Sequence, residues 1–285
     1  MQKSRKKFWI VFTSVIASLV LVGLVCGLAT RLKTVTVEFR ARASAQYTML
    51  EDGVLDRVAK TGEFNTKKSL LFMNFKENID KIEKSNPYIK VEQVVRHFPN
   101  IVKVYVSERI PRYRVADKDD PSKWYILDVD FKVIDVVTGG EESVKDQNYG
   151  RASSFYDMTV KIESEDFEIS THVGSFVTKH TLKQQLNSIS SGVIVALGDI
   201  KLAKSIELSG EKFIITMKNS GINNDDGCQI ELEGIEDLAV KAKAGALAYA
   251  NATDSTTPVD LSGKIITISK DNGSYIGLMR DKETA

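Results

Sequence analysis

The most continuous hydrophobic segment of the chain lies near its N-terminus. Phe8 to Thr30 carries no charged residue, and as a helix it would be about 34 Å long, which matches the hydrocarbon core of a bilayer. A cleaved signal peptide is the alternative, but its apolar core is usually shorter, at about 7–15 residues. Val25 before Cys26 is too bulky for a lipoprotein cleavage site. We therefore predict a retained transmembrane helix over residues 8–30.

Basic residues precede this segment and fix the expected orientation. Lys3, Arg5, Lys6 and Lys7 lie within residues 1–7, and basic flanks stay on the cytoplasmic side of a membrane. We expect residues 1–7 to form a cytoplasmic tail. Everything after residue 30 should then lie outside the cytoplasm.

The pattern after the anchor predicts a compact α+β domain over residues 31–115. Val35, Val37 and Phe39 alternate with polar residues, as in a strand with one buried face. Thr48 and Glu51 have the spacing of a capping box. A helix is expected after them, with Leu50, Val54, Leu55 and Val58 at helical spacing and Gly62 at its end.

Two further strands follow a second helix in this domain. Asn74 is the expected N-cap of that helix, with the apolar stripe Phe75, Ile79 and Ile82, and Asn86-Pro87 stops it. A strand over 89–95 leads to a turn at Phe98-Pro99-Asn100, because proline cannot donate a ladder hydrogen bond. Val102, Val104 and Val106 then alternate with polar residues and predict one buried strand face.

The second half of the chain predicts another α+β domain, built on a largely antiparallel sheet, over residues 116–270. A polar loop is expected over 138–154. Leu182, Leu186 and Ile189 indicate a helix. Strands are expected at 206–208, 213–217 and 228–232. A helix follows them, and its expected buried stripe is Ile235, Leu238, Ala242, Ala246 and Tyr249. Residues 271–285 form a tail or a short last strand.

Composition excludes several classes of function. The formal net charge of +1 gives no support to a nucleic-acid partner. Two cysteines, Cys26 and Cys228, exclude a disulfide scaffold. The three histidines show no metal-ligand spacing, and we expect neither a metal nor another cofactor.

The strongest catalytic alternative is a cysteine enzyme of the cell envelope, with Cys228 assisted by His97, His172 or His180. A nucleophilic cysteine needs its thiolate beside a base. Asp225 and Asp226 just upstream would disfavour a thiolate, and Cys228 begins a strand-like run. We therefore expect structural roles for these four residues. The basic residues Arg109, Arg112 and Arg114 are expected to form a solvated edge, with a lipid-facing or partner-facing patch as the alternative.

Several motifs resemble those of the FtsQ/DivIB family of bacterial division proteins. These are the turn Phe98-Pro99-Asn100 between two alternating strands, Glu108-Arg109-Ile110-Pro111 after them, and the run 231–241, which resembles the family's strand into a lysine-bearing helix. Trp124–Asp128 and Phe131–Ile134 resemble the family's entry hairpin, although Phe131 stands where that hairpin's turn has glycine. Residues 258–261 resemble the family's strand after the lysine-bearing helix. The resemblance implies a POTRA domain (β-α-α-β-β) over 31–115, with Glu108 to Pro111 as its exit, and a second, FtsQ/DivIB-type β domain.

The resemblance also implies a function. Such proteins are non-catalytic, single-pass scaffolds at the division septum that bind FtsL and FtsB/DivIC-type partners and influence the septal peptidoglycan synthase. The alternative is an extracytoplasmic enzyme, such as a cysteine transpeptidase.

A scaffold must act through a surface, and we predict a free sheet edge near the C-terminus. Residues of high β-propensity gather there, and an unpaired edge can accept a partner strand. The resemblance indicates the same mode of binding. The predicted partner-binding residues are Val259, Leu261, Ile265, Ile266, Thr267, Ile268, Tyr275 and Ile276. The alternative is internal pairing of 265–268 with 274–278.

Overall fold

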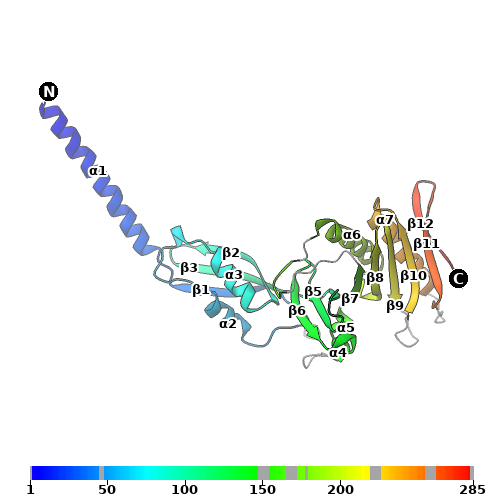
Figure 1. Ribbon diagram of the computed structural model, residues 1–285. Coiled ribbons are helices and arrows are strands. Elements are labelled where there is room, and N and C mark those ends of the chain that lie inside the picture. The colour runs from blue at the N-terminus through cyan, green and yellow to red at the C-terminus, as the bar shows by residue number, and fades with distance from the viewer. Residues whose placement is uncertain are drawn as a thin grey trace. The chain divides into compact units, whose positions relative to one another are not determined.

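The computed structural model describes residues 2–44, 48–146, 154–164, 172–176, 179–218, 226–253 and 261–282. The chain divides into two compact units, with the division between Glu108 and Arg109 (Figure 1). The first unit contains the N-terminal helix and a small sheet with its helices. The second contains a larger sheet with helices of its own.

Helix α1 extends from Gln2 to Ala29. Its apolar part, Trp9–Ala29, is the one helix of the described residues that is long and apolar enough to cross a membrane. This suggests a single-pass membrane anchor, in agreement with the segment predicted from the sequence.

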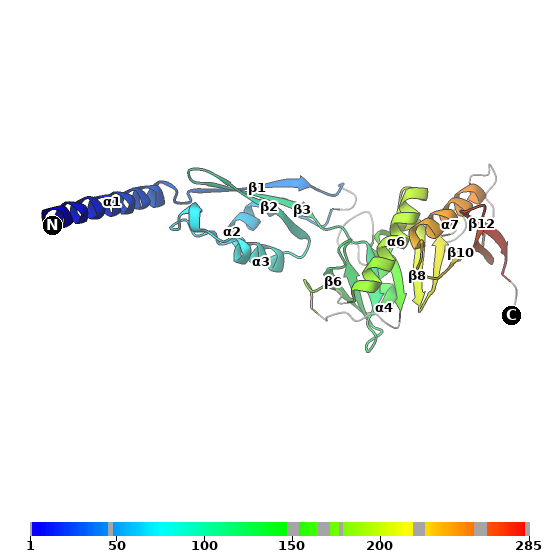
Figure 2. The same cartoon turned by 90° about the horizontal axis from the view of Figure 1, so that it is seen from above.

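The first unit has the predicted order of strand, helix, helix, strand and strand. Its elements are β1 (Thr34–Ala41), α2 (Val54–Thr61), the short 3-10 turn η1 (Leu70–Phe72), α3 (Lys76–Ser85), β2 (Ile89–His97) and β3 (Ile101–Glu108). The sheet order is β1-β3-β2, with β1 parallel to β3 and β2 antiparallel to it. Both helices cover one face of this sheet (Figure 2).

The alternation in β3 produces the core of this unit as predicted. Val102, Val104 and Val106 are fully buried and pack with Ile82 of α3 and Val58 of α2. The residues between the three valines are only partly buried. One face of β3 therefore carries the contacts between sheet and helices.

The predicted capping box at Thr48 is wrong. Helix α2 begins only at Val54, after Gly53 with φ +74°. The Thr48 hydroxyl instead donates to Glu108 Oε1 at 2.9 Å, and that carboxylate also accepts from the N–H groups of Ala43, at 3.1 Å, and Met49. A buried carboxylate requires several donors, and the stretch before α2 supplies them.

The ends of the other helix in this unit agree more closely with the sequence. Asn74 Oδ1 accepts from the N–H of Lys76 at 3.0 Å, although the helix boundary itself is at Phe75. Asn86 ends α3, and Gly62 ends α2, as predicted.

The second unit is a nine-stranded mixed sheet in the order β12-β11-β10-β9-β8-β7-β4-β5-β6. Neighbours are antiparallel except β4–β7, β7–β8 and β10–β11, which are parallel. The strands are β4 (Tyr113–Ala116), β5 (Lys123–Leu127), β6 (Val133–Thr138), β7 (Val160–Ser164), β8 (Ala203–Ser209), β9 (Lys212–Lys218), β10 (Asp226–Glu233), β11 (Lys264–Asp271) and β12 (Ser274–Asp281). The helices are α4 (Gly140–Asp146), α5 (Phe155–Met158), α6 (His180–Leu197) and α7 (Leu238–Thr253), with the 3-10 turn η2 (Ile200–Leu202).

Helices α6 and α7 pack together over the main core of this sheet (Figure 1). Their approach is close at Gly192, where an added Cβ would lie 2.3 Å from the carbonyl oxygen of Ala239. Only a residue without a side chain fits there. The predicted stripe of α7 is buried at Leu238, Ala242, Ala246 and Tyr249. Ile235 precedes the helix and is exposed, so its place in that stripe was wrong.

The polar stretch 138–154 is not a loop throughout. Residues 140–146 form α4, which contacts β5 and β6. Val144 is buried, and so are Trp124 and Val137 of the neighbouring strands. The apolar side chain of Val144 explains why a mostly polar segment lies on the sheet.

Phe131 occupies the turn where glycine was expected and adopts the conformation that glycine would. Its φ is +61°, which is unfavourable for a bulky residue. Its ring is buried and stacks on Tyr113, with centroids 5.0 Å apart and planes at 7°. Burial of an aromatic ring contributes about 2–3 kcal/mol, enough to offset a strain of about 1–3 kcal/mol.

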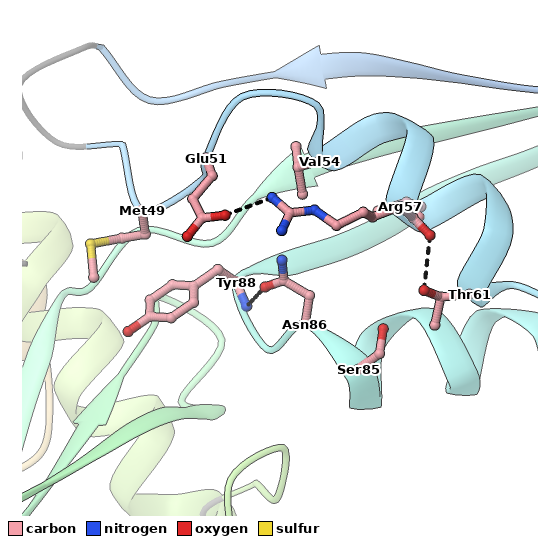
Figure 3. Close-up of a pocket in the computed structure, with 9 residues that line it drawn as sticks. Met49, Glu51, Val54, Arg57, Thr61, Ser85, Asn86 and Tyr88 are labelled. Carbon is pink, nitrogen blue, oxygen red and sulfur yellow. Dashed lines mark hydrogen bonds and ion pairs between the residues drawn. The ribbon is translucent and has the colours of Figure 1, made fainter.

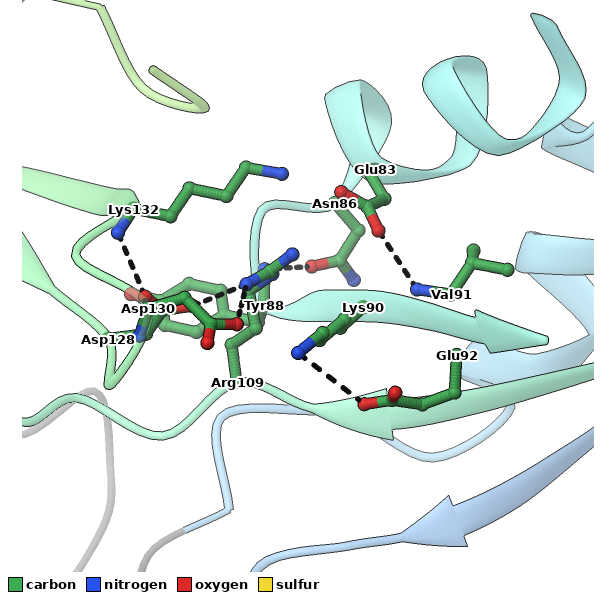
Figure 4. A network of polar contacts seen from close by, with 10 residues as sticks. All are labelled: Glu83, Asn86, Tyr88, Lys90, Val91, Glu92, Arg109, Asp128, Asp130 and Lys132. Carbon is green, nitrogen blue, oxygen red and sulfur yellow. Dashed lines mark hydrogen bonds and ion pairs between the residues drawn. The ribbon is translucent and has the colours of Figure 1, made fainter. Parts of the chain in front are cut away.

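The boundary between the two units lies between Glu108 and Arg109, before the expected boundary at residue 115. Tyr113–Ala116 pair with strands of the second sheet and so belong to the second unit. Arg109 forms a buried ion pair with Asp128, whose Oδ1 accepts from the N–H groups of Asp130 and Lys132, both at 2.9 Å (Figure 4). The predicted solvated edge is therefore wrong for Arg109.

Arg114 is also buried. It donates to the carbonyl oxygen of Thr159 at 2.6 Å, and its guanidinium lies 4.3 Å from the ring centroid of Tyr156. Its place in a solvated edge was likewise wrong.

We predict that Val104→Asp selectively destabilises the first unit. The side chain is fully buried, and an unpaired carboxylate there should cost several kcal/mol. Hydrogen exchange of the amides in residues 89–108 should accelerate strongly, while exchange in the second unit should not. Gln93→Asp, on an exposed position of β2, is the control. Equal exchange in the two variants would show that the core face of β3 has been misassigned.

Candidate functional site

The candidate site is the edge formed by β12. This strand is the last in the sheet order. Among the described residues it pairs on one side only, with β11 along its whole length. β11 in turn pairs with β10 on its other side. The free edge near the C-terminus is therefore β12, and β11 is an interior strand.

This arrangement separates the residues predicted to bind a partner. Ile265, Ile266, Thr267 and Ile268 belong to β11, where Ile266 is fully buried. Their assignment to a free edge was wrong, because 264–271 pair with 274–281. Leu261 is buried in the core, and Val259 lies outside the described residues. Only Tyr275 and Ile276 are on the edge strand.

The backbone of β12 can be oriented from one hydrogen bond. Lys282, directly after the strand, donates its N–H to the carbonyl oxygen of Gly263 at 2.7 Å, toward the β11 side. Backbone groups alternate sides along a strand. The N–H and C=O groups of Tyr275, Gly277 and Met279 therefore face away from β11, where a further strand would pair.

Helix α7 holds the edge strand by close packing. An added Cβ at Gly277 would lie 2.7 Å from Ala248 Cβ and 3.0 Å from the carbonyl oxygen of Ala244. Gly245, the residue after Ala244 in α7, lies against Ile230 of β10 in the same way. Small residues thus let the helix cover β10 and β12 together and keep the edge rigid.

A polar cluster fixes the beginning of β12. The hydroxyl of Tyr275 donates to Asp237 Oδ2 at 3.1 Å, and the ammonium groups of Lys241 and Lys270 lie 5.6 and 5.4 Å from the ring centroid. Desolvation, followed by the hydrogen bond to Asp237, raises the pKa of Tyr275 above its ordinary value. The tyrosine therefore remains neutral and keeps its donor.

The face of β12 opposite α7 carries apolar side chains that are exposed. Ile276 and Leu278 are 39% and 51% exposed. Beyond them the strand ends in Arg280 and Asp281, the latter paired with Lys264. Charges at an edge discourage unspecific pairing, so the apolar stretch is confined to 275–279.

Sequence reasoning did not include Leu278 and Met279 in the site. The signal that identifies them is Asn272-Gly273, between two alternating runs. Both residues have positive φ, at +47° and +84°, as a two-residue hairpin turn requires. The alternative considered from the sequence, internal pairing of 265–268 with 274–278, is therefore the correct one, and it moves the free edge to β12.

Cys228 lies in β10 and is fully buried in the main core. Burial raises the pKa of its thiol to about 12. A nucleophilic cysteine has a lowered pKa and access to substrate, and Cys228 has the opposite properties. His97, His172 and His180 are exposed. Among the described residues, no group of three His, Cys, Asp or Glu side chains could hold a metal.

A pocket in the first unit offers no better catalytic arrangement. It is lined by residues of α2 and of the segments before α2 and β2, among them Glu51, Arg57 and Tyr88 (Figure 3). Arg57 and Glu51 pair with each other at 2.7 Å, and both side chains are mostly exposed. Exposed pairs of this kind contribute little to stability, and neither group is placed as a general acid or base would be.

We predict that Cys228 is unreactive in the native protein. In a Cys26→Ser chain, iodoacetamide at pH 8 should leave Cys228 unmodified without denaturant and alkylate it once the chain unfolds. Because the folded pKa is raised, burial of the neutral thiol favours folding fully below the unfolded pKa of about 8.5. That contribution declines as the pH rises toward 12. Rapid native alkylation at neutral pH would restore the cysteine enzyme as a candidate.

Comparison with known proteins gives one family match. Residues 56–109 match the family model described as POTRA domain, FtsQ-type, which spans α2 to the end of β3. No curated protein matches the chain. Proteins of this POTRA family are generally non-catalytic. An FtsQ-type POTRA domain therefore follows the N-terminal apolar helix in this chain, which supports its resemblance to the FtsQ/DivIB family and a role in cell division.

Proposed function

We propose that the chain is a non-catalytic, single-pass scaffold of the bacterial division complex. The observation that carries the proposal is the FtsQ-type POTRA domain directly after an apolar anchor helix. The family suggests partners within the division complex. We propose FtsL and FtsB/DivIC-type proteins as these partners, with the septal peptidoglycan synthase influenced through them at the septum.

The proposed orientation places the N-terminus in the cytoplasm. Lys3, Arg5, Lys6 and Lys7 flank the apolar helix on one side, and the positive-inside rule assigns that side to the cytoplasm. The POTRA domain and the second unit would then lie in the compartment of peptidoglycan synthesis.

The proposed binding surface is the β12 edge. Tyr275, Gly277 and Met279 offer outward backbone groups, and strand addition uses such groups for affinity. Close packing on α7 orders the edge before a partner arrives, which reduces the entropy lost on binding. The exposed side chains of Ile276 and Leu278 would flank an added strand and give it apolar contacts.

We predict that Met279→Pro abolishes partner capture while leaving the sheet intact. Proline removes an N–H that faces away from β11, and edge strands tolerate it at such positions. Met279→Leu keeps this N–H and a side chain of similar size, so it is the matched control. Co-purification of FtsL- and FtsB/DivIC-type proteins with each variant is the measurement.

Capture of both partners by a folded Met279→Pro chain at the level of Met279→Leu would exclude strand addition at β12. Folding is checked by the unreactive thiol of Cys228, which reports on the same core. Ile266→Pro is unsuitable, because Ile266 is buried and its strand pairs on both sides.

The proposed orientation predicts the outcome of limited proteolysis. External protease added to spheroplasts should digest the POTRA domain and the second unit, leaving a short membrane-embedded fragment. An antibody tag before Lys3 should remain protected. Protection of the C-terminal units from external protease would contradict the assignment.

A further inference from the structure

Two turns lie at the end of the POTRA sheet where β1 begins (Figures 1 and 2). Both turns expose large apolar side chains. In the first turn, η1, Phe72 is 84% and Leu71 is 47% exposed. In the second, between β2 and β3, Phe98 is 57% exposed. Clustered exposed apolar groups in one place usually mark a binding surface.

The first turn is held in place from several sides. The N–H of Phe72 donates to the carbonyl oxygen of Ser69 at 3.2 Å. Arg96 of β2 donates from Nε to the carbonyl oxygen of Leu70 at 3.0 Å and from a terminal nitrogen to that of Met73 at 2.6 Å. The fixed backbone keeps Phe72 directed outward, although a flexible turn could fold it back onto the core.

Both turns are also hydrogen-bonded to the segment that follows α1. The N–H of Leu70 donates to the carbonyl oxygen of Thr30 at 2.8 Å, and the hydroxyls of Thr30 and Ser69 are 2.6 Å apart. The N–H of Lys33 donates to the carbonyl oxygen of Asn100, beside Phe98, at 2.8 Å.

These bonds place the turns near the membrane. The apolar part of α1 ends at Ala29, so Thr30 lies where the chain leaves the hydrocarbon core. A residue spans at most about 3.6 Å of chain, which puts Phe72 within about 7 Å of Leu70 and its contact with Thr30.

The charges around the turns suit a lipid surface. Arg31, Lys33, Lys67 and Lys68 are exposed cations in the same segments, and residues 65–73 contain no acidic side chain. Basic side chains near a membrane are attracted to anionic headgroups. Aromatic and aliphatic side chains between them can enter the boundary between headgroups and acyl chains.

We propose that Leu71, Phe72 and Phe98 insert into the membrane surface from which the POTRA domain emerges, while the neighbouring lysines and arginine bind lipid headgroups. The domain would then be held against the bilayer by a second attachment besides α1. The inference rests on the membrane anchor and not on any division partner. Its failure would leave the proposed scaffold role untouched.

The test uses the full chain in nanodiscs of phosphatidylethanolamine and phosphatidylglycerol. In a Cys26→Ser, Cys228→Ala background, single nitroxide labels are placed at Phe72→Cys, at Phe98→Cys and at Lys84→Cys. Lys84 is exposed near the end of α3, at the far end of β2, about 25 Å along the strand from the turn. Each of the variants labelled at position 72 or 98 replaces an apolar residue in one turn only, so the other turn keeps its native side chains.

Labels at positions 72 and 98 are expected to shift toward collision with oxygen and away from a water-soluble nickel reagent, as at the headgroup–acyl boundary. The label at position 84 should show the reverse. Equal nickel accessibility at all three positions would overturn the proposal. Shielding from both oxygen and nickel at position 72 would also overturn it, since that result indicates burial against protein.

Discussion

The peptide bond between Glu108 and Arg109 is the constraint on which the two units depend. Glu108 ends β3 and accepts hydrogen bonds that hold the stretch before α2. Arg109, the next residue, is buried in the second unit against Asp128, in the β5–β6 turn. A buried charge that loses its partner costs about 3–5 kcal/mol, so each residue is bound to its own unit.

Small residues on α7 have a comparable effect in the second unit. Gly245 allows contact with β10, while Ala244 and Ala248 accept Gly277 of β12. An edge strand with one pairing partner would ordinarily fray. Here the same helix covers the last three strands, and the exposed backbone groups of β12 are presented from a fixed surface.

Most helices and strands could be predicted from the periodicity of apolar residues. The predictions failed where the conformation of a residue depends on a partner far away in the sequence. The spacing of Val102, Val104 and Val106 was enough to define a buried face, because β alternation is a local property. Thr48 has the spacing of a helix cap, yet its hydroxyl donates a hydrogen bond to Glu108, sixty residues later in the chain. Phe131 has a positive φ, which is unfavourable for a bulky residue. It keeps this conformation because its ring stacks on the ring of Tyr113. The free edge was predicted one strand too early. The hydrophobicity of residues 265–268 favoured them as the binding strand, but the hydrogen bonds between strands determine the strand order and place β12 at the edge.

The hairpin turn at Asn272-Gly273 has a consequence for the chain during synthesis. β11 is rich in isoleucine, and until residues 274–281 are made it has no neighbour on its outer side. A flat, apolar, unpaired strand is prone to aggregate. Because the turn joins the two strands through only two residues, the β11–β12 hairpin can form on the microsecond timescale once both strands are present in the folding chain. A chain that ended at Asp271, through interrupted synthesis or proteolysis, would expose the unpaired apolar edge of β11. β12 therefore also protects the domain against aggregation.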